Sequence, residues 1–115
     1  MMKIAIISDI HANFDALHAF PEDYDELWVL GDLVNYGPQP SEVVDRVMKA
    51  AKIIVRGNHD HATASSENLS WKPRWREASE AMTRYTRATL TEGQRTFLNN
   101  LPLHLTADRE GSLSF

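Results

Sequence analysis

The sequence contains no cysteine, which excludes a disulfide-stapled scaffold and any metal site built on thiolates. Glycine and proline are scarce, with five of each among 115 residues, so the chain is neither collagen-like nor of low complexity. Long apolar runs are missing as well. The run at residues 4–7 is too short for a membrane span or a signal-peptide core. We therefore expect a cytoplasmic protein that does not enter a membrane.

Positive charge is not in excess either, because the formal net charge is −4. This balance argues against a dedicated nucleic-acid binder. A basic, aromatic-containing stretch at 72–95 leaves a nucleic-acid face open, but an amphipathic helix explains it more simply. The hydrophobic share of 43% and the charged share of 24% fit a globular domain, and the length predicts a single one over residues 1–115.

The first half of the chain predicts strands that alternate with helices. A helix is predicted over 14–20, where Pro21 ends it, and a second helix starts with Ser41 as its N-cap. Short apolar runs without alternation predict buried strands at 3–8, 27–30 and 53–55. The order strand, helix, strand, helix, strand implies parallel pairing with right-handed crossovers. We therefore expect a layered α/β fold.

The second half predicts helices followed by a hairpin. A helix is expected over 74–89, with one apolar face made of Trp75, Ala78, Met82, Tyr85 and Thr89. Thr91 and Gln94 have the spacing of a capping box, which predicts the start of another helix. Loose alternation over 101–115 predicts a hairpin that turns near Gly111.

Residues that can bind a metal ion follow each predicted strand. Open α/β sheets bind ligands at the carboxyl ends of their strands. The residues in these loops are Asp9 and His11, then Asp32, then Asn58, His59 and Asp60. Such oxygen and imidazole ligands suit manganese, iron, zinc and similar divalent ions. The spacing of Asp9 and His11 predicts that both side chains lie on one side of an extended segment.

Each of these loops alone has an ordinary structural interpretation. Asp9 could cap a helix beside a surface His11, Gly31-Asp32 could be a simple turn, and residues 57–60 could be a turn and helix cap. Their occurrence after three successive strands is what predicts a shared site.

At these residues the chain resembles the calcineurin-like metallophosphoesterases. The matching motifs are Asp9-Ile10-His11, Gly31-Asp32 and Gly57-Asn58-His59-Asp60. The strings 8–13 and 31–38 are similar to those of the small bacterial and archaeal phosphodiesterase branch, and 71–102 is similar to that branch's helical insert. The resemblance implies a layered α/β/β/α sandwich, of which this chain carries the N-terminal βαβαβ half and the insert.

The resemblance also implies a two-metal site. Asp9 and His11 would bind the first ion, Asp32 would bridge both ions, and Asn58 would bind the second. Manganese is favoured, with iron, zinc, nickel or cobalt as alternatives. In such a site the ions activate a hydroxide, which attacks phosphorus in line.

The remaining implied roles concern the substrate. His59 would protonate the leaving alkoxide or stabilise charge on the phosphoryl oxygens. Asn35 and Tyr36 stand where the serine/threonine phosphatases of the family have an Asp and an Arg. Asn35 can hydrogen-bond His59 and share substrate binding with it, but the missing Arg disfavours phosphoprotein phosphatase activity. Ala12 replaces a glycine of the small branch, and we expect that change to be tolerated.

The family's later Gly-His motifs are missing from the sequence. Of the other histidines, His18 is expected on the surface, while His61 and His104 are weaker candidates for metal ligands. The chain thus resembles the N-terminal half of a family domain, which predicts a truncated product. Alternatively, a second copy covers the exposed sheet edge through a dimer or a domain swap.

We therefore predict metal-dependent hydrolysis of a small phosphate ester or nucleotide. The alternative is an inactive or weakly metal-binding regulatory or binding module.

Overall fold

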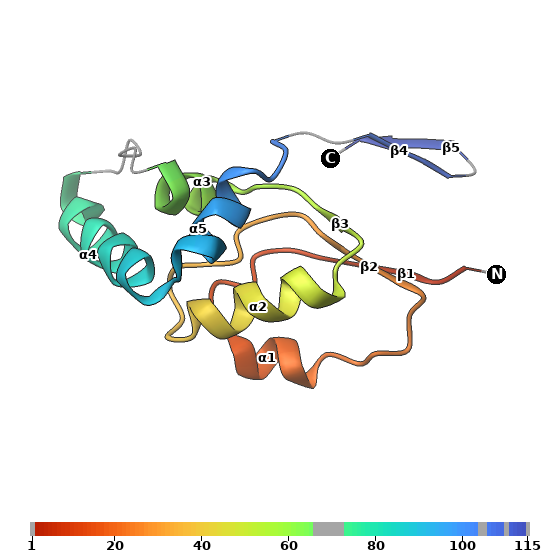
Figure 1. The fold of residues 1–115 in the computed structure, drawn as a ribbon, viewed down its shortest axis with the longest axis horizontal. Coiled ribbons are helices and arrows are strands. Elements are labelled where there is room, and N and C mark those ends of the chain that lie inside the picture. Colours follow the sequence, from red (N-terminus) through yellow and green to blue (C-terminus); the bar gives the residue numbers. More distant parts are fainter. Residues whose placement is uncertain (1, 66–72, 104–105, 110, 115) are drawn as a thin grey trace.

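The computed structural model describes residues 2–65, 73–103, 106–109 and 111–114 (Figure 1). Its first half alternates strands and short helices, as predicted, and its second half is helical before a final hairpin. The elements are β1 (Ile4–Ile7), α1 (Phe14–Ala19), β2 (Glu26–Val29), α2 (Pro40–Ala50), β3 (Ile53–Ile54), α3 (Asn58–Ser65), α4 (Pro73–Thr89), α5 (Glu92–Asn99), β4 (Thr106–Arg109) and β5 (Gly111–Ser114).

The first three strands form one parallel sheet with β2 in the centre. Ile7 of β1 lies opposite Val29 of β2, and Val29 in turn lies opposite Ile54 of β3. Because all three strands run the same way, their carboxyl ends meet at one edge of the sheet. The predicted α/β class with a parallel sheet is confirmed. The predicted hairpin is confirmed as well, because β4 and β5 pair antiparallel on either side of residue 110.

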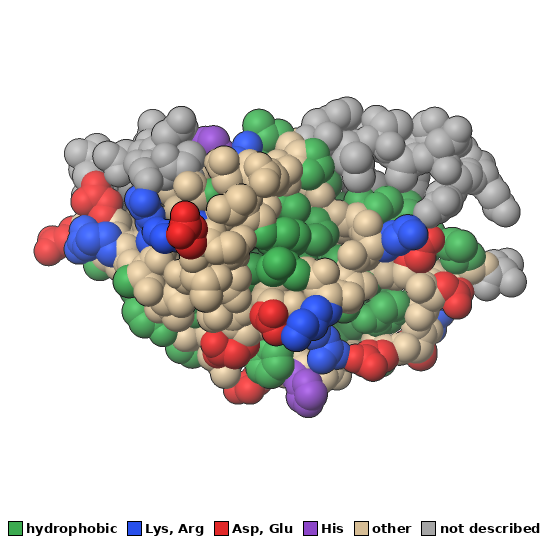
Figure 2. All heavy atoms as spheres, in the orientation of Figure 1, with side chains coloured by type: hydrophobic (Ala, Val, Ile, Leu, Met, Phe, Trp, Pro, Cys, Tyr) green, Lys and Arg blue, Asp and Glu red, His purple; other side chains and the backbone are tan. Residues whose placement is uncertain are grey.

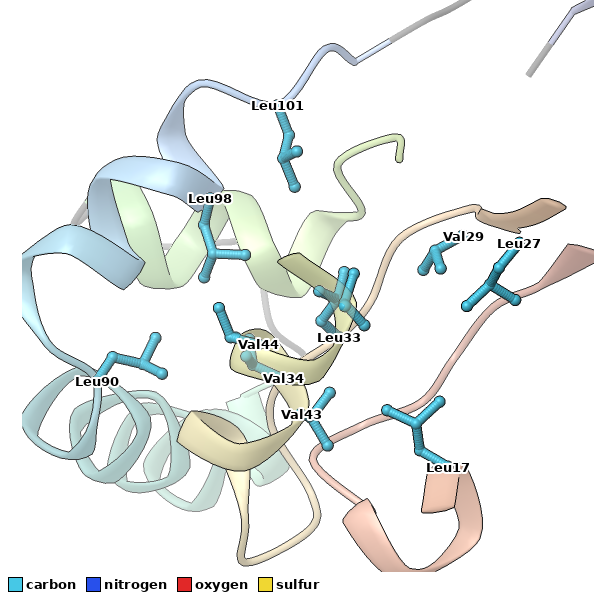
Figure 3. Packing of buried hydrophobic residues seen from close by; sticks show 11 residues of the cluster. Leu17, Leu27, Val29, Leu33, Val34, Val43, Val44, Leu90, Leu98 and Leu101 are labelled. Carbon is cyan, nitrogen blue, oxygen red and sulfur yellow. The ribbon is translucent and has the colours of Figure 1, made fainter. Parts of the chain in front are cut away.

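The hydrophobic core lies between the sheet, α1, α2 and α5. Figure 3 shows Leu98 of α5 pointing toward Val44 of α2 and Leu33 of the loop after β2, and all three are fully buried. The central strand contributes Leu27 and Val29 to the same cluster. Helix α5 therefore packs on the helical layer of the parallel sheet and continues its core.

The surface carries charges of both signs. On the face drawn in Figure 2, acidic and basic side chains are interspersed and do not gather by sign. Some pair directly: Lys49 contacts Asp45 at 2.9 Å, and Arg46 contacts Glu22. Within the described part of the chain, no helix combines the length and the apolar character needed to cross a bilayer.

Three predictions in the first half were wrong in detail. The strand expected at 53–55 is limited to Ile53–Ile54, and both residues are only half-buried. Strand β1 is not fully buried, because it lies at the edge of the three-stranded sheet and leaves Ile6 48% exposed. Helix α2 begins at Pro40 with Gln39 at the N-cap position, two residues before the Ser41 that we expected. The Ser41 hydroxyl contacts the Gln94 side chain of α5 instead, at 3.1 to 3.2 Å.

The predicted inner face of α4 was also wrong. Tyr85 is 49% exposed, and Thr86, which the prediction left outside, is buried. The cause is a polar contact that apolar periodicity cannot detect, because the Thr86 hydroxyl bonds a side chain from the loop after β2. By contrast, the capping box of Thr91 and Gln94 at the start of α5 is confirmed.

Backbone hydrogen bonds join the loops that follow β1 and β2. The amide of Asp9 donates to Gly31 O at 3.1 Å, and that of His11 donates to Asp32 O at 3.0 Å. The loop after β3 lies still closer to the loop after β2. Gly31 has a φ of +97°, and a Cβ added at Gly57 would overlap the Asp32 carboxylate and backbone nitrogen. Glycine is therefore required at both positions for the loops to meet.

Replacement of a core leucine tests whether α5 shares the core of the sheet. We expect Leu98→Ala to lower the free energy of unfolding by about 2–5 kcal/mol, because it leaves a cavity between α5 and α2. Leu103→Ala is the control, since this side chain is 64% exposed, and should change stability by less than about 0.5 kcal/mol. Urea unfolding measures both. Equal small losses would contradict the packing of α5.

A pair of glycine substitutions tests the contact between the loops. Gly57→Ala should destabilise the protein by roughly 1–3 kcal/mol, because the new methyl group must displace Asp32. Gly93→Ala is the matched control in α5, where the added Cβ meets only Thr91 Oγ1, at 3.9 Å. It should raise stability by about 0.5–1 kcal/mol through helix propensity. Thermal unfolding measures both changes in stability. Changes of the same sign in the two variants would refute the close approach of Gly57 to Asp32.

Candidate functional site

Three side chains of metal-ligand type converge at the carboxyl edge of the parallel sheet. Asp9 and His11 come from the loop after β1, and Asp32 comes from the loop after β2. One ligand atom from each lies within 4.8 Å of the other two. Asp9 Oδ1 is 3.4 Å from His11 Nε2. The sequence prediction that these three residues meet is therefore confirmed as a matter of position.

The reason that we gave for this meeting was wrong, because the segment is not extended. Asp9, His11 and Ala12 have φ values of 54°, 48° and 57°, and Asp32 has 55°. Residues with a left-handed backbone conformation bend the chain sharply, so that the side chains of Asp9 and His11 come into contact. Such conformations cost free energy in residues other than glycine and concentrate at functional sites.

Asn58 joins the group from the first residue of α3. Its side-chain amide lies 3.1 and 3.2 Å from the two carboxylate oxygens of Asp32, and the amide nitrogen is the atom that can donate to both. With the amide turned the other way, its oxygen could serve as a ligand for a cation beside Asp32. With Asp9 and His11, the donor set is oxygen and imidazole nitrogen throughout. The residues present therefore fit a hard or borderline divalent cation.

The charge state of Asp9 also suits the binding of a cation. The Ser8 hydroxyl donates to Asp9 Oδ2 at 2.7 Å and is the main cause that lowers the pKa of this carboxyl, with His11 adding to the effect. Asp9 is therefore ionised at neutral pH. Its partner His11 is fixed by a contact of Nδ1 with Val34 O at 3.1 Å, which leaves Nε2 on the side of Asp9.

His59 lies beside this group and is buried. Its ring centroid is 5.2 Å from that of His11 and 5.2 Å from that of Tyr36, and both contacts are edge to face. Burial lowers the pKa of His59, although the charges of Asp32 and Asp9 oppose the shift. The imidazole is therefore mainly neutral at pH 7. Its backbone amide donates to Asp32 Oδ1 at 3.0 Å and so helps to fix that carboxylate.

Asn35 is fully buried and reaches His59, as the sequence suggested. Its Nδ2 lies 3.1 Å from His59 Nδ1. The neighbouring Tyr36 is 67% exposed, and its ring meets that of His11 edge on, with 4.8 Å between the centroids. Both Asn35 and Tyr36 have a φ of 72°, so the backbone is strained where it presents these side chains.

Asp60 is not grouped with the candidate metal ligands and contacts the backbone of two loops instead. Its oxygens accept backbone hydrogen bonds from Asp32 and Leu33, both at 2.8 Å, and from Gly57 at 3.0 Å. Burial raises the pKa of Asp60 to about 6, although these three donors act in the opposite direction. The side chain therefore joins two loops.

Two further histidines of the described residues, His18 and His61, do not belong to the three-residue group. His18 is exposed on α1, as predicted, and stacks on Phe14 with 5.6 Å between the centroids. His61 lies one turn along α3 and is not among the three grouped residues. His104 lies outside the described residues.

Sequence reasoning missed the contribution of α4. Thr83 and Thr86 contact Asn35 from this helix, and the Met82 sulfur accepts a hydrogen bond from the Tyr36 backbone at 2.8 Å. Their partners lie 46 to 51 positions away along the chain. No local spacing pattern links residues that are so far apart, so the sequence offered no signal for them.

Known proteins resemble this chain over most of its length. An uncharacterised protein of Methanocaldococcus jannaschii is 31% identical over 113 residues, which are 94% of this chain and 45% of that protein. The symmetrical bis(5'-nucleosyl)-tetraphosphatase of Psychromonas ingrahamii is 40% identical over 88 residues, covering 60% of this chain and 32% of the enzyme. The chain thus spans less than half the length of either relative.

A solved structure shows the same likeness in three dimensions. The crystal structure of a metallophosphoesterase from Sphaerobacter thermophilus superposes with a TM-score of 0.75 at 38% identity, over 96% of this chain and 45% of that one. The sequence profile of the calcineurin-like phosphoesterases matches residues 2–111, which include all the loops of the site. Motifs, fold and relatives therefore agree, and the chain belongs to the calcineurin-like phosphoesterase family.

Proposed function

We propose that this chain carries the metal-binding half-site of a phosphoester hydrolase. The observation that supports it best is the convergence of Asp9, His11 and Asp32 within 4.8 Å, at the edge where a parallel sheet binds ligands. The buried His59 lies beside them and supplies a hydrogen-bond donor for the substrate.

In this proposal the ligands divide between two divalent ions. Asp9 and His11 hold one, Asn58 holds the other, and Asp32 is shared because its carboxylate lies close to both sets. Manganese is favoured, with iron, zinc, nickel or cobalt as alternatives, since the set contains no soft ligand. When bound, the ions polarise the phosphoryl oxygens and lower the pKa of the attacking water.

His59 acts on the substrate from the side of the site closed by Asn35. It donates a hydrogen bond to a phosphoryl oxygen, or a proton to the leaving oxygen as negative charge develops there. Asn35 holds the ring through the 3.1 Å contact at Nδ1 and, being fully buried, takes part in substrate binding only through His59.

The substrate that we propose is a small phosphate ester of the nucleotide type. Two features support this class. One relative is named as a bis(5'-nucleosyl)-tetraphosphatase. In addition, Tyr36 exposes an aromatic ring beside His59, and such a ring can stack on a nucleobase.

A metal-binding module without turnover is the second candidate. It is favoured by the size of the ligand group, because the described residues bring together three carboxylate and imidazole side chains. If two ions shared these three ligands, each ion would be bound weakly. In that case the chain would hold metal or phosphate for a regulatory purpose.

The shared role of Asp32 is tested by metal binding. Asp32→Asn should weaken Mn²⁺ binding by roughly 100-fold or more, because the neutral amide loses charge at the point between both ions. Asp15→Asn, which changes an exposed carboxylate on α1, should leave the affinity unchanged. Isothermal titration calorimetry with MnCl₂ measures both variants. Equal affinities would remove Asp32 from the ligand set.

The role of His59 is tested by turnover at saturating Mn²⁺. His59→Ala should lower kcat for bis-p-nitrophenyl phosphate by about 10²–10⁴-fold, because the donor to the substrate is lost. Its Mn²⁺ affinity should equal that of the parent. His18→Ala, which changes an exposed histidine outside the site, should retain full activity. A parent chain that binds Mn²⁺ but hydrolyses nothing would favour the binding module instead.

A further inference from the structure

A buried chain of polar contacts links helix α4 to His59. Thr86 Oγ1 lies 2.6 Å from Asn35 Oδ1, and Asn35 Nδ2 lies 3.1 Å from His59 Nδ1. A second contact from the same helix joins Asn35 Nδ2 to Thr83 Oγ1 at 3.3 Å. Asn35 and Thr86 are fully buried, so water does not compete for these groups.

The lengths of these contacts assign the orientation of the Asn35 amide. A separation of 2.6 Å is typical of O–H···O bonds, whereas N–H···O bonds are longer, at about 2.9–3.0 Å. The atom of Asn35 next to Thr86 is therefore the oxygen, and the Thr86 hydroxyl is its donor. The two amide hydrogens then point to His59 Nδ1 and Thr83 Oγ1, so every polar atom of Asn35 has a partner.

The opposite orientation accounts for the distances less well. It would place an N–H group on the 2.6 Å contact and direct the Thr86 hydroxyl to Met82 O at 3.0 Å. Asn35 would then accept a hydrogen from Nδ1 of His59. The position of a single hydroxyl hydrogen on α4 thus decides what Asn35 offers to the histidine.

We propose that Thr86 is a positioning residue that sets the tautomer of His59 through Asn35. Because Asn35 donates to Nδ1, a neutral His59 carries its one hydrogen on Nε2, the ring nitrogen not held by Asn35. Thr83 supports the same orientation by accepting the second amide hydrogen. Helix α4 therefore determines where the hydrogen of His59 lies. The consequence for turnover rests on the proposed function, whereas the tautomer itself does not.

Nitrogen-15 NMR of histidine-labelled, metal-free protein tests the tautomer directly. In the parent chain we expect His59 to show a protonated Nε2 and an unprotonated Nδ1. Thr86→Val removes the hydroxyl at nearly constant shape and should give a mixture of tautomers, while Thr86→Ser should restore the parent pattern. A parent His59 with its hydrogen on Nδ1 would overturn the proposal, whether or not the valine variant folds.

Thr89→Val is the matched control. Thr89 lies on the same helix and is exposed, and its hydroxyl contacts Tyr85 O at 2.8 Å, much as that of Thr86 contacts Met82 O. This variant therefore suffers the same loss of a hydroxyl within the helix but leaves Asn35 untouched. It should keep the parent tautomer. An equal change of the His59 spectrum in both variants would contradict a specific role for Thr86.

Kinetics with Mn²⁺ and bis-p-nitrophenyl phosphate provide the second readout. Thr86→Val should lower kcat by about tenfold with KM unchanged, and Thr86→Ser should recover most of the loss. Unchanged kcat in Thr86→Val, next to an active parent, would overturn the positioning role and leave the hydrolase intact. A parent without hydrolysis would instead refute the proposed function, while the NMR result would still decide the tautomer.

Discussion

The geometry of the site depends on one buried carboxylate that lies outside the group of candidate metal ligands. Asp60 accepts hydrogen bonds from the backbone of Asp32, Leu33 and Gly57, and so joins the loops after β2 and β3. Parallel strands bring these loops to one edge, but parallel pairing alone leaves their separation undefined. The Asp60 contacts define it. They hold the Asp32 carboxylate within reach of Asn58 and of the His59 backbone amide.

The same junction explains why strained backbone persists here. Within the described residues, the positive φ values outside glycine all fall in the loops after β1 and β2. Each costs on the order of 1–3 kcal/mol. The hydrogen bonds of Asp9 and His11 to the second loop, with those made by Asp60, offset this cost and hold the conformation. Because the strained residues and these hydrogen bonds lie in the same loops, the backbone itself holds the candidate ligand side chains together.

Much of this arrangement could be predicted from the sequence, because it follows from local patterns. Apolar runs gave the order of strands and helices, and parallel strand order placed Asp9, Asp32 and Asn58 at one edge. The conformation of the first loop could not be predicted. The Asp9–His11 spacing fits an extended segment equally well, and the hydrogen bonds that favour left-handed residues come from another loop.

The inner face of α4 could not be predicted for a different reason. Apolar periodicity selected Tyr85, which is half exposed, over Thr86, which is buried. Threonine is tolerated in that buried position because Asn35 accepts a hydrogen bond from its hydroxyl. Asn35 lies 51 residues earlier in the chain. A buried polar pair of this kind satisfies the hydrogen-bonding groups of both partners at once, but neither residue taken alone predicts the pair. Functional sites are where such pairs are expected, since packing alone does not orient a histidine.

The identity of residue 35 bears on what His59 can do. An aspartate at this position would favour a charged imidazolium, whereas Asn35 is neutral and offers an N–H group to Nδ1. A donor at Nδ1 opposes protonation of that nitrogen, because the two hydrogens would then face each other. The ring consequently donates from Nε2 as a neutral group.

Of the two roles proposed for His59, stabilising charge on a phosphoryl oxygen needs no more than such a donor. Full proton transfer to a leaving alkoxide would instead create an imidazolate ion, unless Nδ1 first gained a hydrogen and Asn35 turned. Under the proposed function, the buried network therefore favours charge stabilisation by His59 over proton donation to the leaving group.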